Sequence, residues 1–380
     1  MQLADEYRPG TGFFFGTADR SLLTDGHAVT LPGRGGLAPH RAHRILRALG
    51  DDQILVGAVP FDDTTPAHLV IPEQYRWGPA LSPEPPGAES SRPRLSWAPD
   101  GYPEAVEQAL LDIESTELSK VVLARRVCLP LPEPLPVADV LRRLRHRQTT
   151  GYVFGCELPG GRTLIGGSPE LLVSRDGDTV TAHPLAGSRP RTGDPETDRR
   201  ATRDLLSSNK DHREHAAVVK AIATALSPYC RELDVPAEPS VVSTSHMLHL
   251  GTRITGRLAD PAPSALALAA ALHPTPAVCG TPTVTARRTI ARLENFDRGF
   301  YAGMIGWSDA AGNGEWAVTI RCAEATADRV RLYAGAGIVA GSSPQAELAE
   351  TQAKLETMLA ALGGHITGEA QVDHDLHTMA

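Results

Sequence analysis

Four separated segments of the chain place an ammonium or a carboxylate group beside apolar residues, where it can take part in acid–base or metal chemistry. The residues concerned are Lys120, Glu170, Glu214, Glu347 and Glu350. An amine and a carboxyl group can act as base and acid, and further carboxylates supply the hard oxygen ligands that Mg²⁺ prefers. The set suits a small anionic substrate that is held by a cation and transformed by proton transfer.

Lys120 and Glu170 are the candidate base and acid. Lys120 begins an apolar, β-rich run, and burial there would disfavour its charged form and let it take a proton from water near neutral pH. Glu170 follows Ser168-Pro169 at the start of a predicted strand, where burial would raise its pKa. The local sequence alone favours simpler roles, a lysine that protects a strand edge and a surface carboxylate at a strand end.

Glu214 is a candidate metal ligand on a predicted helix. It lies between His212 and His215, but the spacing matches no zinc motif, which favours oxygen ligands around Mg²⁺ over a zinc site. The simpler alternative is an ion pair of Glu214 with Arg213 or Lys210.

Glu347 and Glu350 are the other candidate ligands, on a predicted helix over 345–362. They share a face with Lys354 beside an apolar stripe, and the alternative is a solvated face with an i,i+4 pair between Glu350 and Lys354. The Gly-rich segment 333–339 predicts a turn before this helix, whose free N–H groups could bind an anion.

Arg321 and His249 are further polar candidates in β-rich surroundings. Arg321 is expected on a strand, where a guanidinium group suits two-point binding of a carboxylate. Histidines such as His249 are more often core residues with satisfied hydrogen bonds than catalysts.

The elements that must position these residues are short strands in antiparallel groups, with helices between the groups. This order predicts an α+β fold rather than a doubly wound α/β fold. A tight hairpin is expected over 171–182, and an antiparallel meander over 301–333. Helices are predicted over 102–118, 198–226 and 345–362.

Composition excludes several other classes of protein. The 380 residues carry a net charge of −8 without basic clusters, which disfavours a nucleic-acid partner. No apolar run approaches the roughly 20 residues that span a bilayer, so no membrane partner is expected. Five cysteines without a CxxC pair favour a reducing cytoplasm.

Residues 1–100 contain too little apolar sequence for a core of their own, so we expect them to be part of the same fold as 101–362. The Pro-, Ser- and Gly-rich stretch 77–103 is interpreted as an irregular connection within that fold. The polar tail 363–380 is expected to be mobile.

In their order, these segments resemble the chorismate-utilising enzymes, most closely the isochorismate synthases of the siderophore-pathway type. The resemblance covers nearly the whole chain and is strongest over 120–362. Its most specific stretches are 184–189, 273–277, 312–316 and 334–339. It implies a single chorismate-binding α+β domain with two stacked antiparallel sheets flanked by helices, and a monomer.

The resemblance also implies roles for individual residues. Lys120 matches the base that activates water for attack at C2 of chorismate, and Glu170 matches the acid that protonates the departing C4 hydroxyl. Glu214 and Glu350 match ligands of Mg²⁺, with Glu347 close to the water shell of the metal. Substrate-binding positions are matched by His249, Thr252, Ala277, Arg321, Gly335 and Lys354.

Two positions indicate which nucleophile this chain uses. Aminodeoxychorismate synthases carry a nucleophilic lysine where this chain has Ala186, and the ammonia-using relatives lack the lysine that Lys120 matches. The resemblance therefore implies an isomerase that uses water and needs no amidotransferase subunit. The alternatives are a salicylate synthase, which goes on to eliminate pyruvate, and a non-catalytic chorismate-binding subunit.

Overall fold

The computed structural model describes residues 2–10, 12–31, 44, 50–62, 65–82, 101–147 and 150–363. The connection expected over 77–103 and the tail expected over 363–380 lie largely outside these residues. Among the helices that are described, none is both long and apolar enough to cross a membrane.

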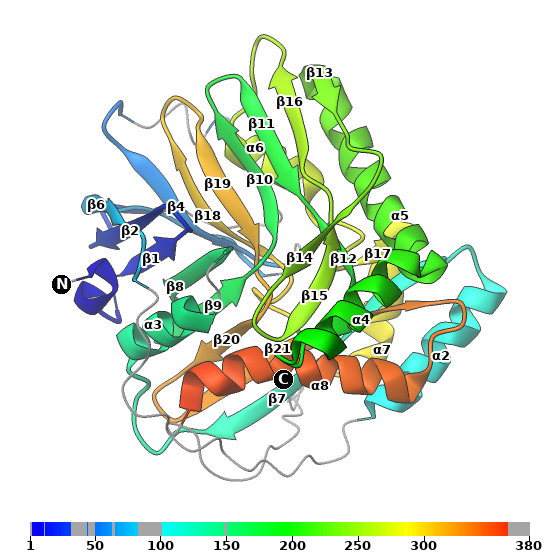
Figure 1. Cartoon of the computed structure of the whole chain (residues 1–380). Coiled ribbons are helices and arrows are strands. Elements are labelled where there is room, and N and C mark those ends of the chain that lie inside the picture. The colour runs from blue at the N-terminus through cyan, green and yellow to red at the C-terminus, as the bar shows by residue number, and fades with distance from the viewer. Residues whose placement is uncertain are drawn as a thin grey trace, which may run out of the picture.

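Two large antiparallel sheets form the body of the described chain (Figure 1). The first has the strand order β17 (Gly280–Thr281), β7 (Lys120–Pro130), β21 (Arg329–Val339), β20 (Cys322–Ala325), β9 (Arg162–Ser168), β8 (Tyr152–Leu158), β1 (Phe13–Gly16), β2 (Arg20–Asp25), β6 (Gln74–Pro79). The second has the order β13 (Cys230–Asp234), β16 (Ile254–Leu258), β11 (Thr179–His183), β10 (Leu171–Asp176), β19 (Gly314–Val318), β18 (Met304–Asp309), β4 (Ile54–Val59), β5 (His68–Ile71), β3 (Val29–Leu31). This confirms the predicted α+β class.

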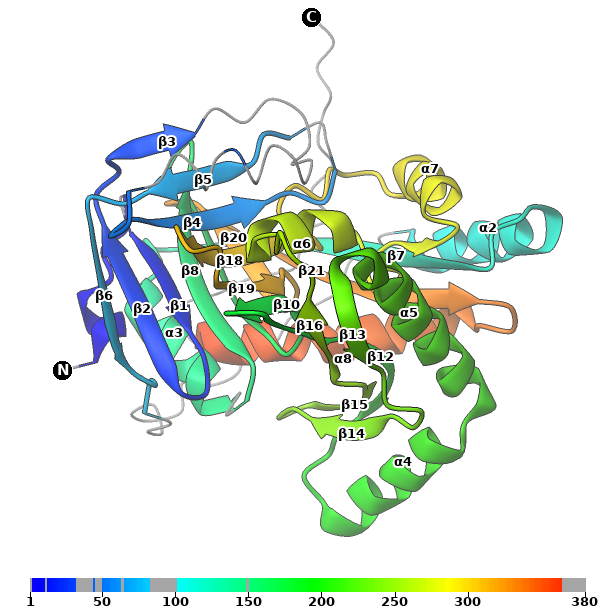
Figure 2. The same ribbon diagram turned by 90° about the horizontal axis from the view of Figure 1, so that it is seen from above.

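A small third sheet was not predicted from the sequence. It has the order β12 (Leu185–Pro190), β15 (Met247–Gly251), β14 (Ser240–Ser243). Figure 2 shows it next to the helix Pro195–Ser207 (α4), which lies between β12 and β14 in the chain.

Helices cover the outside of the sheets (Figures 1 and 2). They are α2 (Tyr102–Ser115), α3 (Val137–Arg147), α4 (Pro195–Ser207), α5 (Asn209–Leu226), α6 (Ala265–Leu272), α7 (Thr283–Leu293) and α8 (Pro344–Leu362), with 3₁₀ turns at Leu3–Glu6 and Ser227–Tyr229. Helix α8 packs on β21 and against α2 and α3, whereas α6 packs on β10, β18 and β19. The largest apolar cluster joins both large sheets through side chains such as Phe154 and Trp316, which are fully buried.

The meander predicted over 301–333 is wrong, because its strands belong to two sheets. Strands β18 and β19 pair in the second sheet, and β20 and β21 pair in the first. The chain crosses between the sheets at 319–321, where Arg321 adopts a left-handed backbone with φ of 50°. No Gly or Pro occurs at this crossing, so the sequence gives no signal that the strand ends there. Arg321 therefore lies between strands and not on one.

The single helix predicted over 198–226 is also wrong, since two helices lie there. Ser208 has an extended backbone, with φ of −79° and ψ of 107°, and its side chain accepts a hydrogen bond from the N–H of Asp211. A serine in this conformation caps the helix that follows, and so α5 begins at Asn209. The chain changes direction between α4 and α5 (Figure 2).

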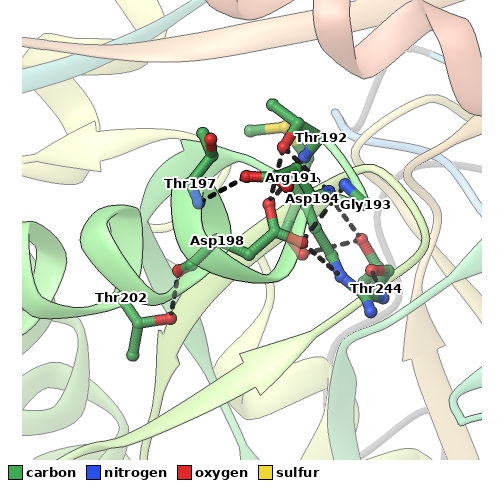
Figure 3. Close-up of polar contacts among 9 residues, drawn as sticks. Arg191, Thr192, Gly193, Asp194, Thr197, Asp198, Thr202 and Thr244 are labelled. Atoms are coloured by element: carbon green, nitrogen blue, oxygen red, sulfur yellow. Dashed lines mark hydrogen bonds and ion pairs between the residues drawn. The ribbon is translucent and has the colours of Figure 1, made fainter.

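Hydrogen bonds around Asp198 fix the loop between β12 and α4 (Figure 3). Its carboxylate accepts from the backbone N–H of Thr192 at 2.8 Å and from the side chain of Arg191 at 3.4 Å. Arg191 also donates to the carbonyl oxygen of Thr244 at 2.9 Å, in the loop between β14 and β15. The side chain of Asp194 caps the first turn of α4. These bonds join α4 to the small third sheet.

Candidate active site

A cavity of about 870 Å³ lies where β7, β12, β15 and β21 meet helices α5 and α8. Segments that are distant in the sequence therefore contribute to one site. The predicted site residues that line it are Glu170, Glu214, His249, Ala277, Arg321, Gly335, Glu347, Glu350 and Lys354. Lys120 and Thr252 are not among the lining residues, and Lys120 is in contact with one of them, Glu214.

Lys120 is buried at the start of β7. It is 3% exposed, and Thr281 of β17 pairs beside it, so β7 is not an exposed edge at this point and the edge-protecting alternative is wrong. Its Nζ lies 2.8 Å from Oε1 of Glu214, which does line the cavity. Burial is the largest single effect and would raise the pKa of Glu214, but the charge and hydrogen bond of Lys120, together with the charges of Lys354 and Lys210, lower it overall.

Glu170 lies between β9 and β10 and is 3% exposed. Its backbone is held at both ends, because its N–H donates to the hydroxyl of Ser168 at 3.2 Å and its carbonyl accepts from Val318 at 3.1 Å. Burial raises the pKa of the Glu170 carboxyl to about 8, against the smaller lowering effects of a backbone hydrogen bond from Leu185 and the charge of Lys120. The raised pKa predicted from the sequence is confirmed, and the surface-charge alternative is wrong.

Glu347 and Glu350 lie one turn apart at the start of α8. Glu347 is 3% exposed and lies 3.4 Å from Nζ of Lys210, so the solvated-face alternative is wrong for this residue. Glu350 forms the i,i+4 ion pair with Lys354 that belonged to that alternative, at 2.6 Å. The pKa of Glu347 is raised, first by burial and then by the negative charge of Glu350.

These carboxylates have the chemistry of a site for a hard cation. A divalent cation would relieve the repulsion between Glu347 and Glu350, and Glu214 lines the same cavity. Each of the three is paired with a lysine instead, and no three acidic, histidine or cysteine side chains of the described residues form a ligating cluster as they stand. The three carboxylates fit Mg²⁺, and binding of the ion would require their lysine partners to move away.

Arg321 and Lys354 supply positive charge inside the cavity. Lys354 Nζ donates to the carbonyl oxygen of Gly335 at 2.8 Å, on strand β21, and the turn predicted before the helix follows this strand at 340–341. Burial lowers the pKa of Arg321 to about 10, and no carboxylate of the described residues lies within 4.0 Å of its guanidinium group. A buried cation of this kind is prepared for an anionic ligand.

His249 and Thr252 take different places. Nε2 of His249 accepts from Arg321 at 3.4 Å, and its Nδ1 lies 3.0 Å from the hydroxyl of Ser188. Thr252 is buried outside the cavity lining, and its hydroxyl lies 2.7 Å from Nε2 of His215 on α5. Thr252 therefore supports the helix that carries Glu214.

Sequence reasoning missed several residues of the lining. Lys210 stands one helical turn before Glu214, and this i,i+4 spacing is a signal that could have placed it in the site. Tyr301 and Tyr333 line the cavity with stacked rings, 5.2 Å apart between centroids. No local pattern marks these two tyrosines, because Tyr301 lies in the loop before β18 and Tyr333 lies on β21, far apart in the sequence.

The cavity combines acidic and basic side chains that are largely removed from water, as in enzymes that use acid–base chemistry. A family model described as "Chorismate binding enzyme" matches residues 78–363, and the chain belongs to that family. The chain is 48% identical to isochorismate synthase DhbC of Bacillus subtilis, over 95% of this chain and 96% of that protein. It is 41% identical to the vibriobactin-specific isochorismate synthase of Vibrio cholerae, over 95% and 94%.

A solved structure confirms the architecture. The crystal structure of DhbC from Bacillus anthracis superimposes with a TM-score of 0.87 at 44% identity, covering 95% of this chain and 98% of that one. The expectation of two stacked antiparallel sheets in one chorismate-binding fold is therefore confirmed.

Proposed function

We propose that this protein is an isochorismate synthase, an isomerase that converts chorismate to isochorismate for a 2,3-dihydroxybenzoate siderophore or related metabolite. The observation that carries the proposal is that two glutamates in one cavity have pKa values shifted in opposite directions. The pKa of Glu170 is raised, whereas that of Glu214, which is paired with Lys120, is lowered. Relatives with the name isochorismate synthase match this chain over nearly their full length.

In this reaction, water adds at C2 of the ring and the C4 hydroxyl leaves. Lys120, released from its ion pair with Glu214, takes a proton from the attacking water, and the two ring double bonds shift as the C4–O bond breaks. Glu170 gives its proton to the departing oxygen, which leaves as water. One water is consumed and one is released, so the net reaction is an isomerisation. With a pKa of about 8, Glu170 holds its proton at neutral pH.

The substrate is a dianion and needs two receptors. Arg321 and Lys354 bind carboxylate oxygens, with the backbone at Gly335 and the side chains of His249 and Ala277 shaping the pocket around the ring. Glu214, Glu347 and Glu350 would hold Mg²⁺. When bound, the metal supplies positive charge for the ring carboxylate.

Water is the proposed nucleophile because the position of the nucleophilic lysine of aminodeoxychorismate synthases is an alanine in this chain. Ala186 lines the cavity at the position where a nucleophilic lysine would stand, and its side chain has no reactive group. We further propose that the protein works as a monomer in the cytoplasm, without an amidotransferase subunit.

The test is conversion of chorismate by the purified protein with Mg²⁺ and without ammonia, followed by chromatography of the products. Isochorismate is expected, and added isochorismatase should consume it. Pyruvate released in proportion to chorismate consumption would show a salicylate synthase, and no consumption would show a non-catalytic subunit. Chelation with EDTA should abolish turnover, and Mg²⁺ should restore it.

A further inference from the structure

His249 connects the small third sheet to the buried guanidinium group of Arg321. It lies on β15, is 5% exposed, and accepts a hydrogen bond at Nε2 from Arg321 at 3.4 Å. Arg321 lies at the crossing between the two large sheets. The contact therefore joins elements of three sheets at the cavity wall.

The neighbouring strand β12 fixes which ring nitrogen of His249 carries the proton. The register shifts between Ala186 and Ser188, so that Ser188 stands directly opposite His249. The residue in the bulge is Gly187, whose φ of 78° suits glycine. The guanidinium of Arg321 can only donate, so Nε2 is an acceptor and the neutral ring carries its proton on Nδ1, where β12 supplies the hydroxyl of Ser188 at 3.0 Å. The backbone of Gly187 also hydrogen-bonds the imidazole.

The imidazole is also kept neutral. Burial lowers the pKa of His249 well below its ordinary value, and the charges of Arg321 and Lys354 lower it further. With Nδ1 protonated and the ring uncharged, Nε2 has a free lone pair directed at Arg321. A charged imidazole would repel the guanidinium instead.

Arg321 needs such a partner because little else orients it. It lies outside the strands, its backbone is left-handed with φ of 50°, and no carboxylate of the described part of the chain is within 4.0 Å. A long side chain without a fixed partner occupies several rotamers, and two-point binding of a carboxylate requires one orientation.

We propose that His249 is a positioning residue, which the Gly187–Ser188 segment holds as the neutral Nδ1–H tautomer so that Nε2 orients Arg321 toward a substrate carboxylate. The inference rests on the proposed function, and it assigns His249 no proton transfer to the substrate. The remaining N–H groups of Arg321 are then left for the carboxylate. An interaction of this kind strengthens substrate binding without changing the chemical step.

The first test compares two substitutions of His249. His249→Met fills a similar volume without an acceptor, and should raise the KM for chorismate about tenfold with kcat within about threefold of wild type. His249→Gln keeps an acceptor near the Nε2 position and should recover most of the lost affinity. A fall in kcat at unchanged KM would overturn the proposal, because it would indicate a direct role in chemistry.

The second test asks whether Ser188 acts through His249. Ser188→Ala alone should raise KM by about threefold, a smaller effect because the carbonyl group of Gly187 remains. In the His249→Met background it should add nothing, and equal effects in both backgrounds would contradict the proposal. Ser240→Ala is the matched control, because its hydroxyl donates to Gly251 on the same small sheet, and both constants should stay at wild-type values.

Calorimetric dissociation constants for chorismate, measured on the same variants, separate this inference from the proposed function. If the wild-type protein binds chorismate without turnover, the proposed function fails, and the Kd values alone decide the role of His249. The same order of affinities is expected, with wild type and His249→Gln tighter than His249→Met. Equal Kd values for all three would overturn the proposal.

Discussion

Two glutamates in one cavity have pKa values shifted in opposite directions, because Lys120 is in contact with only one of them. Glu170 and Glu214 are both largely removed from water, which raises the pKa of each carboxyl. The ammonium of Lys120 is in contact with Glu214, at 2.8 Å. It lowers the pKa of Glu170 as well, but this effect is smaller than that of burial. Glu214 is therefore an anion at neutral pH while Glu170 keeps its proton. This difference separates a ligand or counter-ion from an acid.

Removal of the proposed base should stop catalysis without loss of the fold. Lys120→Ala is expected to lower kcat by about 10²- to 10⁴-fold, the range typical of a general base. Steady-state assays with chorismate and Mg²⁺ measure this, and circular dichroism checks the fold. Lys220→Ala, on the exposed face of α5, is the control and should keep full activity. Near-native turnover of Lys120→Ala would refute the assigned role.

The acid limb of the mechanism predicts a pH dependence. Glu170 must be protonated to act, and its pKa is about 8, so kcat/KM in the free enzyme should fall tenfold per pH unit above that value. A pH–rate profile from 6 to 10 measures it. Glu170→Gln cannot donate a proton and should lose activity at every pH. A profile that stays level up to pH 10 would exclude Glu170 as the acid.

At the scale of elements, strand β21 beside β7 leaves room for the contact between Lys120 of β7 and Glu214 of α5. Gly337 of β21 pairs with Val122, next to the start of β7. A Cβ atom at Gly337 would lie 2.7 Å from Oε1 of Glu214 and 3.1 Å from Cε of Lys120. The glycine therefore leaves the space that the Lys120–Glu214 pair occupies.

Gly337→Ala should displace this pair. The added methyl group pushes on the end of a flexible glutamate side chain, so activity is expected to fall about 10- to 100-fold while the melting temperature changes by less than about 4 °C. Activity assays and thermal unfolding measure the two effects. Gly50→Ala is the control, since its Cβ would meet only the side chain of Gln53 at 3.6 Å or more. Full activity of Gly337→Ala would show that the position of the pair is not critical.

The sequence predicted those elements whose signals are local. The strand at Lys120, the hairpin over 171–182 and the helix carrying Glu350 follow from hydrophobic period and turn residues, and the structure contains them. The crossing at Arg321 and the third sheet depend on pairing between distant segments, which leaves no local pattern. Family resemblance supplied the site residues, but it did not supply Lys210 or the Lys120–Glu214 contact. Both depend on how α5 packs against β7 in the folded chain.

On the scale of the whole molecule, the site lies where strands of the first and third sheets meet two helices. Such a junction removes the acidic and basic groups from water, which is what shifts the pKa of Glu170, Arg321 and His249. The same burial lowers stability, because a group held in an unfavourable ionisation state opposes folding. Function at this site therefore costs stability in the whole fold.

Glu170 makes that cost measurable. Its pKa is about 8 in the folded protein and about 4.5 when unfolded, so the unfolded chain loses its proton first as pH rises. The stability associated with the neutral form is present below pH 4.5 and is lost progressively up to pH 8. The loss is on the order of 4 kcal/mol by pH 9.

Glu170→Gln removes this linkage, because its amide stays neutral. The variant should gain about 5 °C in melting temperature relative to wild type between pH 5 and pH 9. Thermal unfolding of both proteins at the two pH values measures the difference. The exposed Glu114→Gln variant controls for loss of a carboxylate and should show no such gain. A constant difference between Glu170→Gln and wild type at both pH values would mean that Glu170 is ionised in the folded protein, and then it could not serve as the acid.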